Sequence, residues 1–143
     1  MAGNKSNSIV YLDSVVGISA SELEGFFIGW PLPPSPNTLR AILGNSTHIV
    51  VAYDNDQKKA IGFVNCISDG ILSAYIPLLE VLPEYQHRGI GSELIDRLLE
   101  KTQHYYMVDL CCDESLIPFY EKINFQKVTG MIKRNHMRQL GNK

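Results

Sequence analysis

Several features that define special classes of protein are scarce or missing in this sequence. The 143 residues include three cysteines and four histidines, and neither Cys-x-x-Cys nor His-Glu-x-x-His spacing occurs. The spacing therefore does not support a zinc site or a disulfide framework, although both remain alternatives to free thiols. We therefore expect no metal, and we expect reduced, packed thiols, including the adjacent Cys111 and Cys112.

The chain also lacks a long apolar run and an excess of positive charge. No run approaches the roughly 18 residues of a membrane span, and residues 1–8 lack the apolar core of a secretory signal. The formal net charge is −2 at pH 7, whereas a general nucleic-acid binder carries a basic excess. These absences predict a cytoplasmic protein that binds neither membranes nor nucleic acid.

The length fits one domain, residues 1–143. A chain of about 150 residues removes roughly two-thirds of its unfolded surface from water, which is enough for a core. Four prolines between Pro31 and Pro36 exclude a helix or a central strand there. They would suit a domain linker, but only about thirty residues precede them, too few for a separate core. We interpret the run as a stiffened loop between two helices.

Apolar periodicity predicts alternating strands and helices along the chain. The strands are expected at 8–12, 48–53, 60–67, 71–82, 105–112, 125–129 and 131–136. The helices are expected to begin at Ser21, Asn37, Gly89 and Asp113. Gly62 lies inside a strand and indicates either a bulge or a packing need. The strand at 105–112 is so apolar that we expect it to be buried.

The stretch from Leu79 to Lys101 organises the chain: an apolar strand, a glycine-containing turn, then a helix. Glycine lets backbone N–H groups approach a ligand, and the first helical turn has unpaired N–H groups and a partial positive charge. Arg88 adds a full charge. The turn is therefore predicted to hold a phosphate or pyrophosphate, although Arg88 could instead be an ordinary surface charge.

Two motifs resemble the GCN5-related N-acetyltransferase (GNAT) superfamily. Gln86-x-x-Gly89-x-Gly91, preceded by Leu79-x-Val81-x-Pro83-x-Tyr85, is similar to its acetyl-CoA signature. Phe119-Tyr120-Glu121-Lys122-Ile123-Asn124-Phe125 resembles its Phe-Tyr-Glu-Lys-x-Gly-Phe segment, with asparagine in the place of glycine. The resemblance covers roughly residues 61–132 and implies acetyl-CoA as co-substrate.

The resemblance implies an α/β fold with a mixed, mostly antiparallel sheet of six to seven strands and about four flanking helices. In this superfamily the fourth and fifth strands form a splayed parallel pair, and the gap receives the pantetheine arm of acetyl-CoA. Pro77, in the predicted fourth strand, fits such a gap because proline cannot donate a ladder hydrogen bond. The expected coenzyme contacts are Leu79, Val81, Gln86, the backbone of His87, Arg88, Gly89, Ile90, Gly91, Ser92 and Asp113.

Asp113 stands where the family frequently has an asparagine that bonds pantetheine. An aspartate can only accept hydrogen bonds, so it could instead cap a helix. The segment between the first two helices walls the acceptor pocket in such enzymes, which makes Phe26, Phe27 and Trp30 candidates for substrate contact, together with Tyr75. The alternative is that the three aromatic residues before the prolines belong to the core.

The implied reaction transfers the acetyl group directly from the thioester to a primary amine. An amine with a pKa near 10.4 is protonated at pH 7, which opposes attack by roughly 4–5 kcal/mol, so a base must take its proton. Family members often place this base at positions that here fall near Tyr75 and Pro77, but neither residue is a good base at neutral pH. Glu80 is the nearest carboxylate, but strict alternation points it away from Leu79 and Val81 unless a bulge re-aims it. An ordered water chain is the alternative.

Tyr120 occupies the family's catalytic tyrosine position and is expected to return a proton to the coenzyme thiolate. The alternative for Tyr120 is simple packing on a helix face. Two other functions are kept: an acetyl-CoA-binding sensor or partner module without catalysis, and a nucleotide-binding α/β domain that prefers ATP or NAD. The acceptor is expected to be a small-molecule or peptidyl amine, and the protein a possible homodimer.

Overall fold

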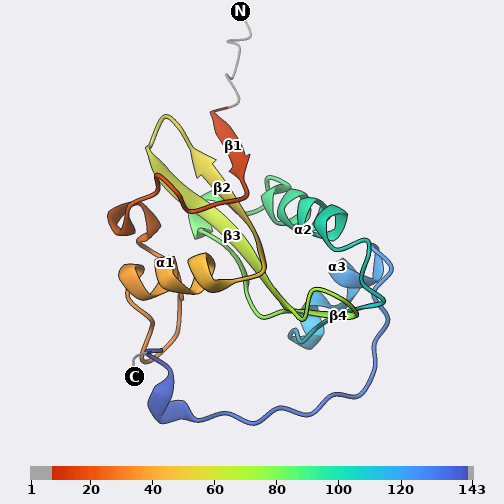
Figure 1. The fold of residues 1–143 in the computed structure, drawn as a ribbon. Coiled ribbons are helices and arrows are strands. Elements are labelled where there is room, and N and C mark those ends of the chain that lie inside the picture. The colour runs from red at the N-terminus through yellow and green to blue at the C-terminus, as the bar shows by residue number, and fades with distance from the viewer. Residues whose placement is uncertain (1–7, 142–143) are drawn as a thin grey trace, which may run out of the picture.

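The protein is described by a computed structural model over residues 8–141 (Figure 1). The strands are β1 (Ile9–Leu12), β2 (His48–Asp54), β3 (Lys59–Ser68), β4 (Ser73–Ile76), β5 (Leu79–Val81) and β6 (Met107–Leu110). The α-helices are α1 (Pro36–Asn45), α2 (Ile90–Lys101) and α3 (Ile117–Glu121). Short 3₁₀ turns are η1 (Ala20–Leu23), η2 (Pro83–Tyr85), η3 (Glu114–Leu116) and η4 (His136–Arg138).

The six strands form one mixed sheet, in which β1, β2, β3, β4 and β6 are neighbours in that order and β5 pairs with β3. Every pairing is antiparallel except that of β4 with β6. The expected mixed, mostly antiparallel α/β fold is confirmed. The described residues hold three α-helices rather than about four, because the helix expected from Ser21 is only the turn η1, whose N-cap is Ser19.

Helix α2 covers one face of the sheet because its apolar stripe falls at helical spacing. Leu94, Ile95 and Leu98 are fully buried. Gly62 on β3 permits this contact: a Cβ there would lie 3.1 Å from the Leu94 side chain and 3.2 Å from the carbonyl oxygen of Glu80. The register between β2 and β3 also shifts beside Gly62. Both interpretations of this glycine, a bulge and a packing need, therefore apply.

Turn η1 and helix α1 pack on the other side of the sheet (Figure 1). The proline run is a loop, as predicted, and its last proline, Pro36, is the first residue of α1. Proline suits this position because its fixed φ is helical and no N–H is needed there. The Ser35 side chain caps the helix by accepting a hydrogen bond from the N–H of Thr38, at 3.1 Å.

The strand expected at 71–82 is broken in two at Pro77. Segment β4 pairs in parallel with β6, up to Ile76 opposite Leu110. Segment β5 pairs with β3 alone. A proline at the break removes one ladder donor, which explains why regular pairing stops there. The splayed parallel pair of the prediction is thus β4 with β6, and the divergence begins after Ile76.

The carboxyl-terminal part differs most from the prediction. The strands expected at 125–129 and 131–136 do not form in the described residues; the chain instead crosses from α3 to η4 as an extended segment (Figure 1). Strand β6 therefore lies at an edge, and the expectation of a buried strand at 105–112 is wrong. Cys111 and Cys112 are exposed free thiols rather than packed ones, whereas Cys66 is buried. No helix in residues 8–141 is long and apolar enough to cross a membrane.

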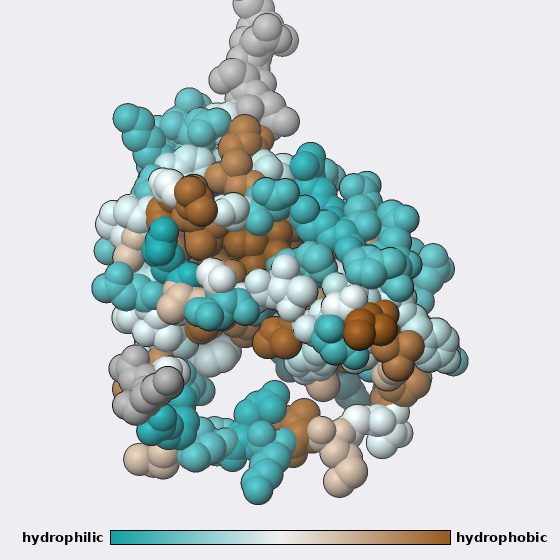
Figure 2. Space-filling view, in the orientation of Figure 1, coloured by the Kyte–Doolittle hydropathy of each residue, from teal (hydrophilic) through white to brown (hydrophobic). Residues whose placement is uncertain are grey.

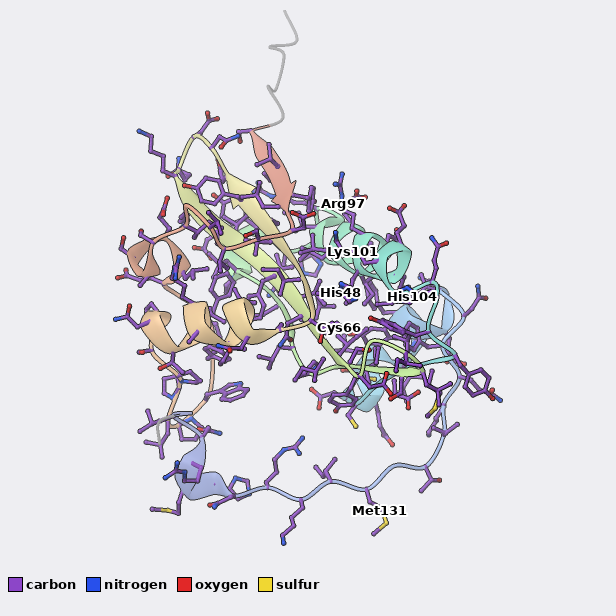
Figure 3. All side chains as sticks on the ribbon, in the orientation of Figure 1. His48, Cys66, Arg97, Lys101, His104 and Met131 are labelled. Atoms are coloured by element: carbon purple, nitrogen blue, oxygen red, sulfur yellow. The ribbon has the colours of Figure 1, made fainter. Side chains whose placement is uncertain are left out.

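The stability of the fold is expected to depend on His48, whose ring Nε2 lies 2.9 Å from the hydroxyl of Tyr105. The ring centre of His48 is 6.5 Å from that of His104, and both residues are labelled in Figure 3. Burial lowers the pKa of His48, with smaller contributions from His104 and Lys101. The unfolded chain takes up this proton below a pKa of about 6.5, and the folded chain does so only at lower pH, so stability is lost as the pH falls.

We expect His48→Gln to reduce the drop in melting temperature between about pH 7 and pH 5, measured by calorimetry or circular dichroism. The matched control is His136→Gln on the exposed η4 turn. An equal drop in both variants and in the unmodified protein would contradict the role of His48.

Candidate active site

In the described residues, strand β5 has an unpaired edge on the side away from β3, and this edge is called the gap below. The N–H of Leu82 donates to Ile61 and the N–H of Asn65 donates to Leu78, at 2.9 and 3.2 Å, so the even-numbered residues of this strand face β3. Alternation turns the backbone of Leu79 and Val81 toward the gap. Within the described residues no strand pairs with that side of β5. The carbonyl oxygen of Val81 accepts a hydrogen bond from Nε2 of Gln86 at 3.0 Å, so the backbone of Leu79 and the N–H of Val81 are what this edge leaves without a strand partner.

Asn65 was missed by the sequence prediction, although it holds the break open. Its side-chain oxygen accepts a hydrogen bond from the N–H of Leu78, at 3.1 Å, and its amide donates to the hydroxyl of Ser46, also at 3.1 Å. The side chain is 1% exposed. A buried amide keeps its place only when hydrogen-bonded. The signal in the sequence is one asparagine inside an otherwise apolar strand.

The turn between β5 and α2 carries the predicted cradle. His87 and Gly89 both adopt left-handed backbone conformations, with φ of 62° and 79°, and Gly89 is the N-cap of α2. An added Cβ at Gly89 would meet no heavy atom within 4 Å. The space above the turn is therefore open. Turns of this kind aim successive N–H groups at one point and favour anions.

Side chains around the turn fix its shape. Gln86 donates from Nε2 to the carbonyl of Val81 at 3.0 Å, and Arg88 donates to the carbonyl of Glu84 at 3.0 Å. The guanidinium of Arg88 also lies 5.1 Å from the centre of the Tyr85 ring. Arg88 is exposed and makes no ion pair in the described residues, so its charge remains available to a ligand. At the start of α2, Ile90 is buried and Ser92 is exposed.

The turn is anchored to the sheet through Tyr85. The Tyr85 hydroxyl donates to Asp54 at 2.7 Å. Burial, with the Asp54 carboxylate, raises the pKa of Tyr85 to about 12. Because this tyrosine stays protonated, the anchor persists throughout the neutral range.

Tyr120 lies on α3 and is buried between two rings. The ring centres of Phe119 and Phe125 are 4.9 and 5.6 Å from that of Tyr120. Burial raises the pKa of Tyr120, and the neighbouring Cys112 thiol adds to the rise. Within the described residues the Tyr120 hydroxyl makes no hydrogen bond, so it is free to donate to a ligand.

Asn124 explains how the second motif tolerates the loss of its glycine. This residue adopts φ of 69°, in the left-handed region, directly after α3. Asparagine is among the residues that tolerate that region best. The N–H of Phe125 then donates to the carbonyl of Tyr120 at 3.1 Å, which closes the helix.

Glu80 points to the opposite face from Leu79 and Val81, as strict alternation predicts, and no bulge within β5 re-aims it. Both carboxylate oxygens lie 2.9 Å from the N–H of Phe27. Burial raises the pKa of Glu80, while the N–H groups of Phe27 and Ile28 act in the other direction. Phe27 has φ of 63°, an uncommon conformation for a bulky residue. The carboxylate therefore holds this loop against the sheet.

The aromatic residues before the proline run divide into two groups. Phe26 and Phe27 are 9% and 4% exposed and pack on Phe63, so the core interpretation describes both. Trp30 is 39% exposed, and its ring centre lies 4.9 Å from that of Phe27. Tyr75 on β4 is equally exposed, at 39%. Of the four aromatic candidates for substrate contact, Trp30 and Tyr75 are the two whose side chains are exposed to a substrate.

A hollow of about 450 Å³ adjoins the Glu80 side of the molecule. It is lined by Ser21, Glu22, Glu24, Gly25, Ile28, Lys59, Leu82, Pro83 and Glu84. Three carboxylates against one lysine give it a negative balance. Such a surface attracts cations such as protonated amines.

Asp113 is exposed at the start of η3, and its side chain makes no capping hydrogen bond. The capping alternative is therefore wrong for this residue. In the described part of the chain, no group of three or more histidine, cysteine, aspartate or glutamate residues could hold a metal ion.

Comparison with known proteins bears on this site. A model of the GNAT acetyltransferase domain matches residues 45–127, more than half of the chain. The protein named uncharacterized N-acetyltransferase ycf52 from Pyropia yezoensis is 27% identical over 129 residues, which cover 87% of this chain and 74% of that protein. Histone acetyltransferase TAP1 from Glycine max is 29% identical over 110 residues, covering 69% of this chain and 47% of that protein.

Solved structures show the same architecture. A crystal structure of a candidate acetyltransferase from Deinococcus radiodurans R1 is 42% identical, with a TM-score of 0.92 over 96% of this chain and 95% of that one. Glucosamine-6-phosphate N-acetyltransferase from Arabidopsis thaliana, at 14% identity and a TM-score of 0.64, covers 90% of this chain and 98% of its own and shares the fold. With the family match spanning the gap, the cradle and Tyr120, the chain belongs to the GNAT family of acetyltransferases.

Proposed function

We propose that the protein transfers the acetyl group of acetyl-CoA to a primary amine by direct attack. The observation that carries this proposal is the gap beside β5, which offers the backbone of Leu79 and the N–H of Val81, without a strand partner, next to an open, left-handed turn at the start of α2. An extended amide chain ending in a diphosphate fits such an arrangement, because it pairs like an added strand and places its anion at a helix N-terminus.

The coenzyme is held by three kinds of group in this proposal. The backbone at Leu79 and Val81 pairs with pantetheine. The turn from Gln86 to Gly91, with the first turn of α2, binds the diphosphate, and Arg88 adds charge. The side chain of Asp113 is exposed and makes no capping hydrogen bond, so it is free to accept a hydrogen bond from a pantetheine N–H.

The chemistry needs a donor for the oxyanion and two proton movements. The Leu79 N–H supplies the donor where negative charge develops. Glu80, whose pKa is raised by burial, accepts the amine proton directly or through water. The nitrogen then forms its bond to the acetyl carbon as the carbon–sulfur bond breaks, and Tyr120 returns a proton to the leaving sulfur. Its raised pKa keeps Tyr120 protonated at neutral pH.

The acceptor class follows from the surface on the Glu80 side. Trp30 and Tyr75 offer exposed aromatic area, and the separate hollow lined by Glu22, Glu24 and Glu84 has a negative balance. A small amine with an apolar body, or a peptidyl lysine, suits both features.

We propose the cytoplasm as the compartment and the whole of residues 1–143 as one domain, although one relative is named GCN5-related N-acetyltransferase 2, chloroplastic.

The deciding experiment combines calorimetry with an amine screen. We expect acetyl-CoA to bind with measurable heat and ATP or NAD to give none, and we expect at least one amine to release free thiol from acetyl-CoA. Binding of acetyl-CoA without thiol release across a broad panel of amines would favour the sensor module. The position of Glu80, on the opposite face from Leu79 and Val81, also favours that alternative. Preference for ATP or NAD would overturn the proposal.

Arg88 is expected to contribute to coenzyme affinity through charge. Arg88→Gln should raise the Kd for acetyl-CoA by about ten- to 100-fold, because one charge-assisted contact to a phosphate is worth roughly 1.5–3 kcal/mol. The difference should shrink as salt is added. Arg97→Gln is the control, since Arg97 is exposed on α2 and already paired with Glu93 at 2.7 Å. Equal affinities in the two variants would make Arg88 an ordinary surface charge.

A further inference from the structure

We propose that a second hollow, between β1 and α2, binds a small zwitterion with an apolar body, namely a free α-amino acid with an apolar side chain. This β1–α2 hollow has a volume of about 340 Å³. It is lined by Tyr11, Leu12, Asp13, Ser14, Val16, Val50, Arg97, Glu100 and Lys101. None of these residues belongs to the gap beside β5, to the cradle or to the hollow on the Glu80 side. The proposal therefore goes beyond the acetyl transfer and does not rest on it.

The β1–α2 hollow has the size and the apolar floor of a small-molecule site. Ligand pockets commonly measure about 300–1,000 Å³ and are lined largely by apolar surface. Val50 on β2 is buried and Leu12 at the end of β1 is half-buried, and together they form the floor. In the space-filling view hydrophobic residues are visible beside the hydrophilic surface of α2 (Figure 2). The apolar side chain of a ligand therefore has a surface to cover.

The wall on α2 carries charges of both signs. Arg97, Glu100 and Lys101 lie on one face of the helix, because residues three and four apart are neighbours there. Arg97 and Lys101 project from the same side of α2 in Figure 3. On the opposite wall Asp13, directly after β1, supplies a second carboxylate. The lining thus holds two cations and two carboxylates.

Contacts within the protein hold both cations at the rim. Nζ of Lys101 lies 3.2 Å from Oδ2 of Asp13, which joins α2 to the segment after β1. The guanidinium of Arg97 lies 4.6 Å from the centre of the Tyr11 ring, and its Nε is 2.7 Å from Glu93. Both ion pairs are accessible to solvent. Ion pairs of this kind are weak, so a ligand can take the place of one partner at little cost.

The balance of charge selects a zwitterion over other small ligands. A simple anion such as phosphate would be attracted to Arg97 and Lys101 but repelled by the two carboxylates. A simple amine would be attracted to the carboxylates but repelled by the cations. An amino acid can place its carboxylate beside Lys101 and its ammonium beside Asp13, so that two charge-assisted contacts replace one ion pair. Its side chain then covers the floor at Val50.

Titration of the full chain with L-leucine or L-phenylalanine at pH 6, followed by NMR of the backbone amides, tests the proposal. At this pH the ligand carboxylate and ammonium are both charged. We expect saturable shifts at residues 11–16, 50 and 97–101, with a Kd of about 1 mM or below. Leucine amide lacks the carboxylate and N-acetylleucine lacks the ammonium, so each should bind about tenfold or more weakly than L-leucine. Glycine, which has no apolar side chain, should lose a similar factor.

Variants of the two walls separate ligand contact from a structural effect. Lys101→Gln should weaken L-leucine by about tenfold without weakening leucine amide, which has no carboxylate for this lysine to meet. Asp13→Asn should weaken L-leucine without weakening N-acetylleucine, for the corresponding reason. A merely structural change would weaken every ligand alike. The matched controls are Lys127→Gln and Asp96→Asn, at exposed positions outside the hollow, and both should bind L-leucine as the unmodified protein does.

The absence of saturable shifts with both amino acids would overturn the proposal. So would equal affinities for L-leucine and its amide, shifts that gather away from the β1–α2 hollow, or a Lys101→Gln variant that binds L-leucine unchanged. Because no acetyl-CoA is present in these titrations, failure here is distinct from failure of the proposed reaction.

Discussion

Replacing Tyr120 by phenylalanine is expected to lower turnover about 100-fold while the Kd for acetyl-CoA changes by less than about twofold. The substitution removes the hydroxyl that we propose protonates the leaving thiolate, and it keeps the ring. The ring contacts to Phe119 and Phe125, at 4.9 and 5.6 Å between centres, survive in the variant. Stability should therefore remain within roughly 0.5 kcal/mol of the unmodified protein.

The pH dependence of turnover distinguishes a Tyr120 that donates a proton from a Tyr120 that only packs. Burial raises the pKa of Tyr120, so its loss of a proton falls at alkaline pH and should appear as an alkaline decline in turnover. That decline should vanish in Tyr120→Phe. Tyr106→Phe is the control, because Tyr106 is 85% exposed. Unchanged turnover in Tyr120→Phe would assign this tyrosine to packing alone.

Replacing Glu80 by glutamine should lower turnover by about 100-fold or more if its carboxylate accepts the amine proton. Glutamine keeps an oxygen for the Phe27 N–H, now 2.9 Å from both carboxylate oxygens, so the loop should stay in place. The unmodified enzyme should lose activity as the pH falls through the raised pKa of Glu80. This acidic decline should be absent in the variant, as measured by thiol release across pH.

Alanine at position 80 distinguishes a catalytic base from a residue that only holds the Phe27 loop. Glu80→Ala leaves the Phe27 N–H without its partner and should destabilise the fold by about 1–3 kcal/mol in thermal unfolding. If glutamine retains full turnover and only alanine loses it, Glu80 holds the loop and a water chain carries the proton. Glu100→Gln, at an exposed carboxylate on α2, is the control for loss of charge.

Local patterns predicted the parts of the fold that depend on nearby residues. The spacing of Leu94, Ile95 and Leu98 indicates a helix and the face it buries, and all three are fully buried. The prolines predicted a loop because they remove donors wherever they stand. Glu80 was placed on the correct face by alternation alone. The glycine turn, too, follows from residues that are adjacent in the chain.

Partners distant in the sequence were harder to predict. The role of Asn65 depends on Leu78, thirteen positions away, and that of Glu80 depends on Phe27, fifty-three positions away. The exposure of Cys111 and Cys112 depends on whether another strand lies beside β6. Strong strand propensity in residues 125–136 does not form a strand, because β pairing needs an edge within reach as well as a suitable sequence.

The sequence by itself determined the family, the order of most elements and the position of the glycine turn before α2, since these rest on short motifs and local periodicity. Only the tertiary structure decided where the fourth strand divides, that the Glu80 carboxylate meets the N–H of Phe27, and which sheet edge stays open. The physical reason is that a hydrogen bond or a buried contact between remote residues depends on how the whole chain packs, and no local pattern encodes that distance.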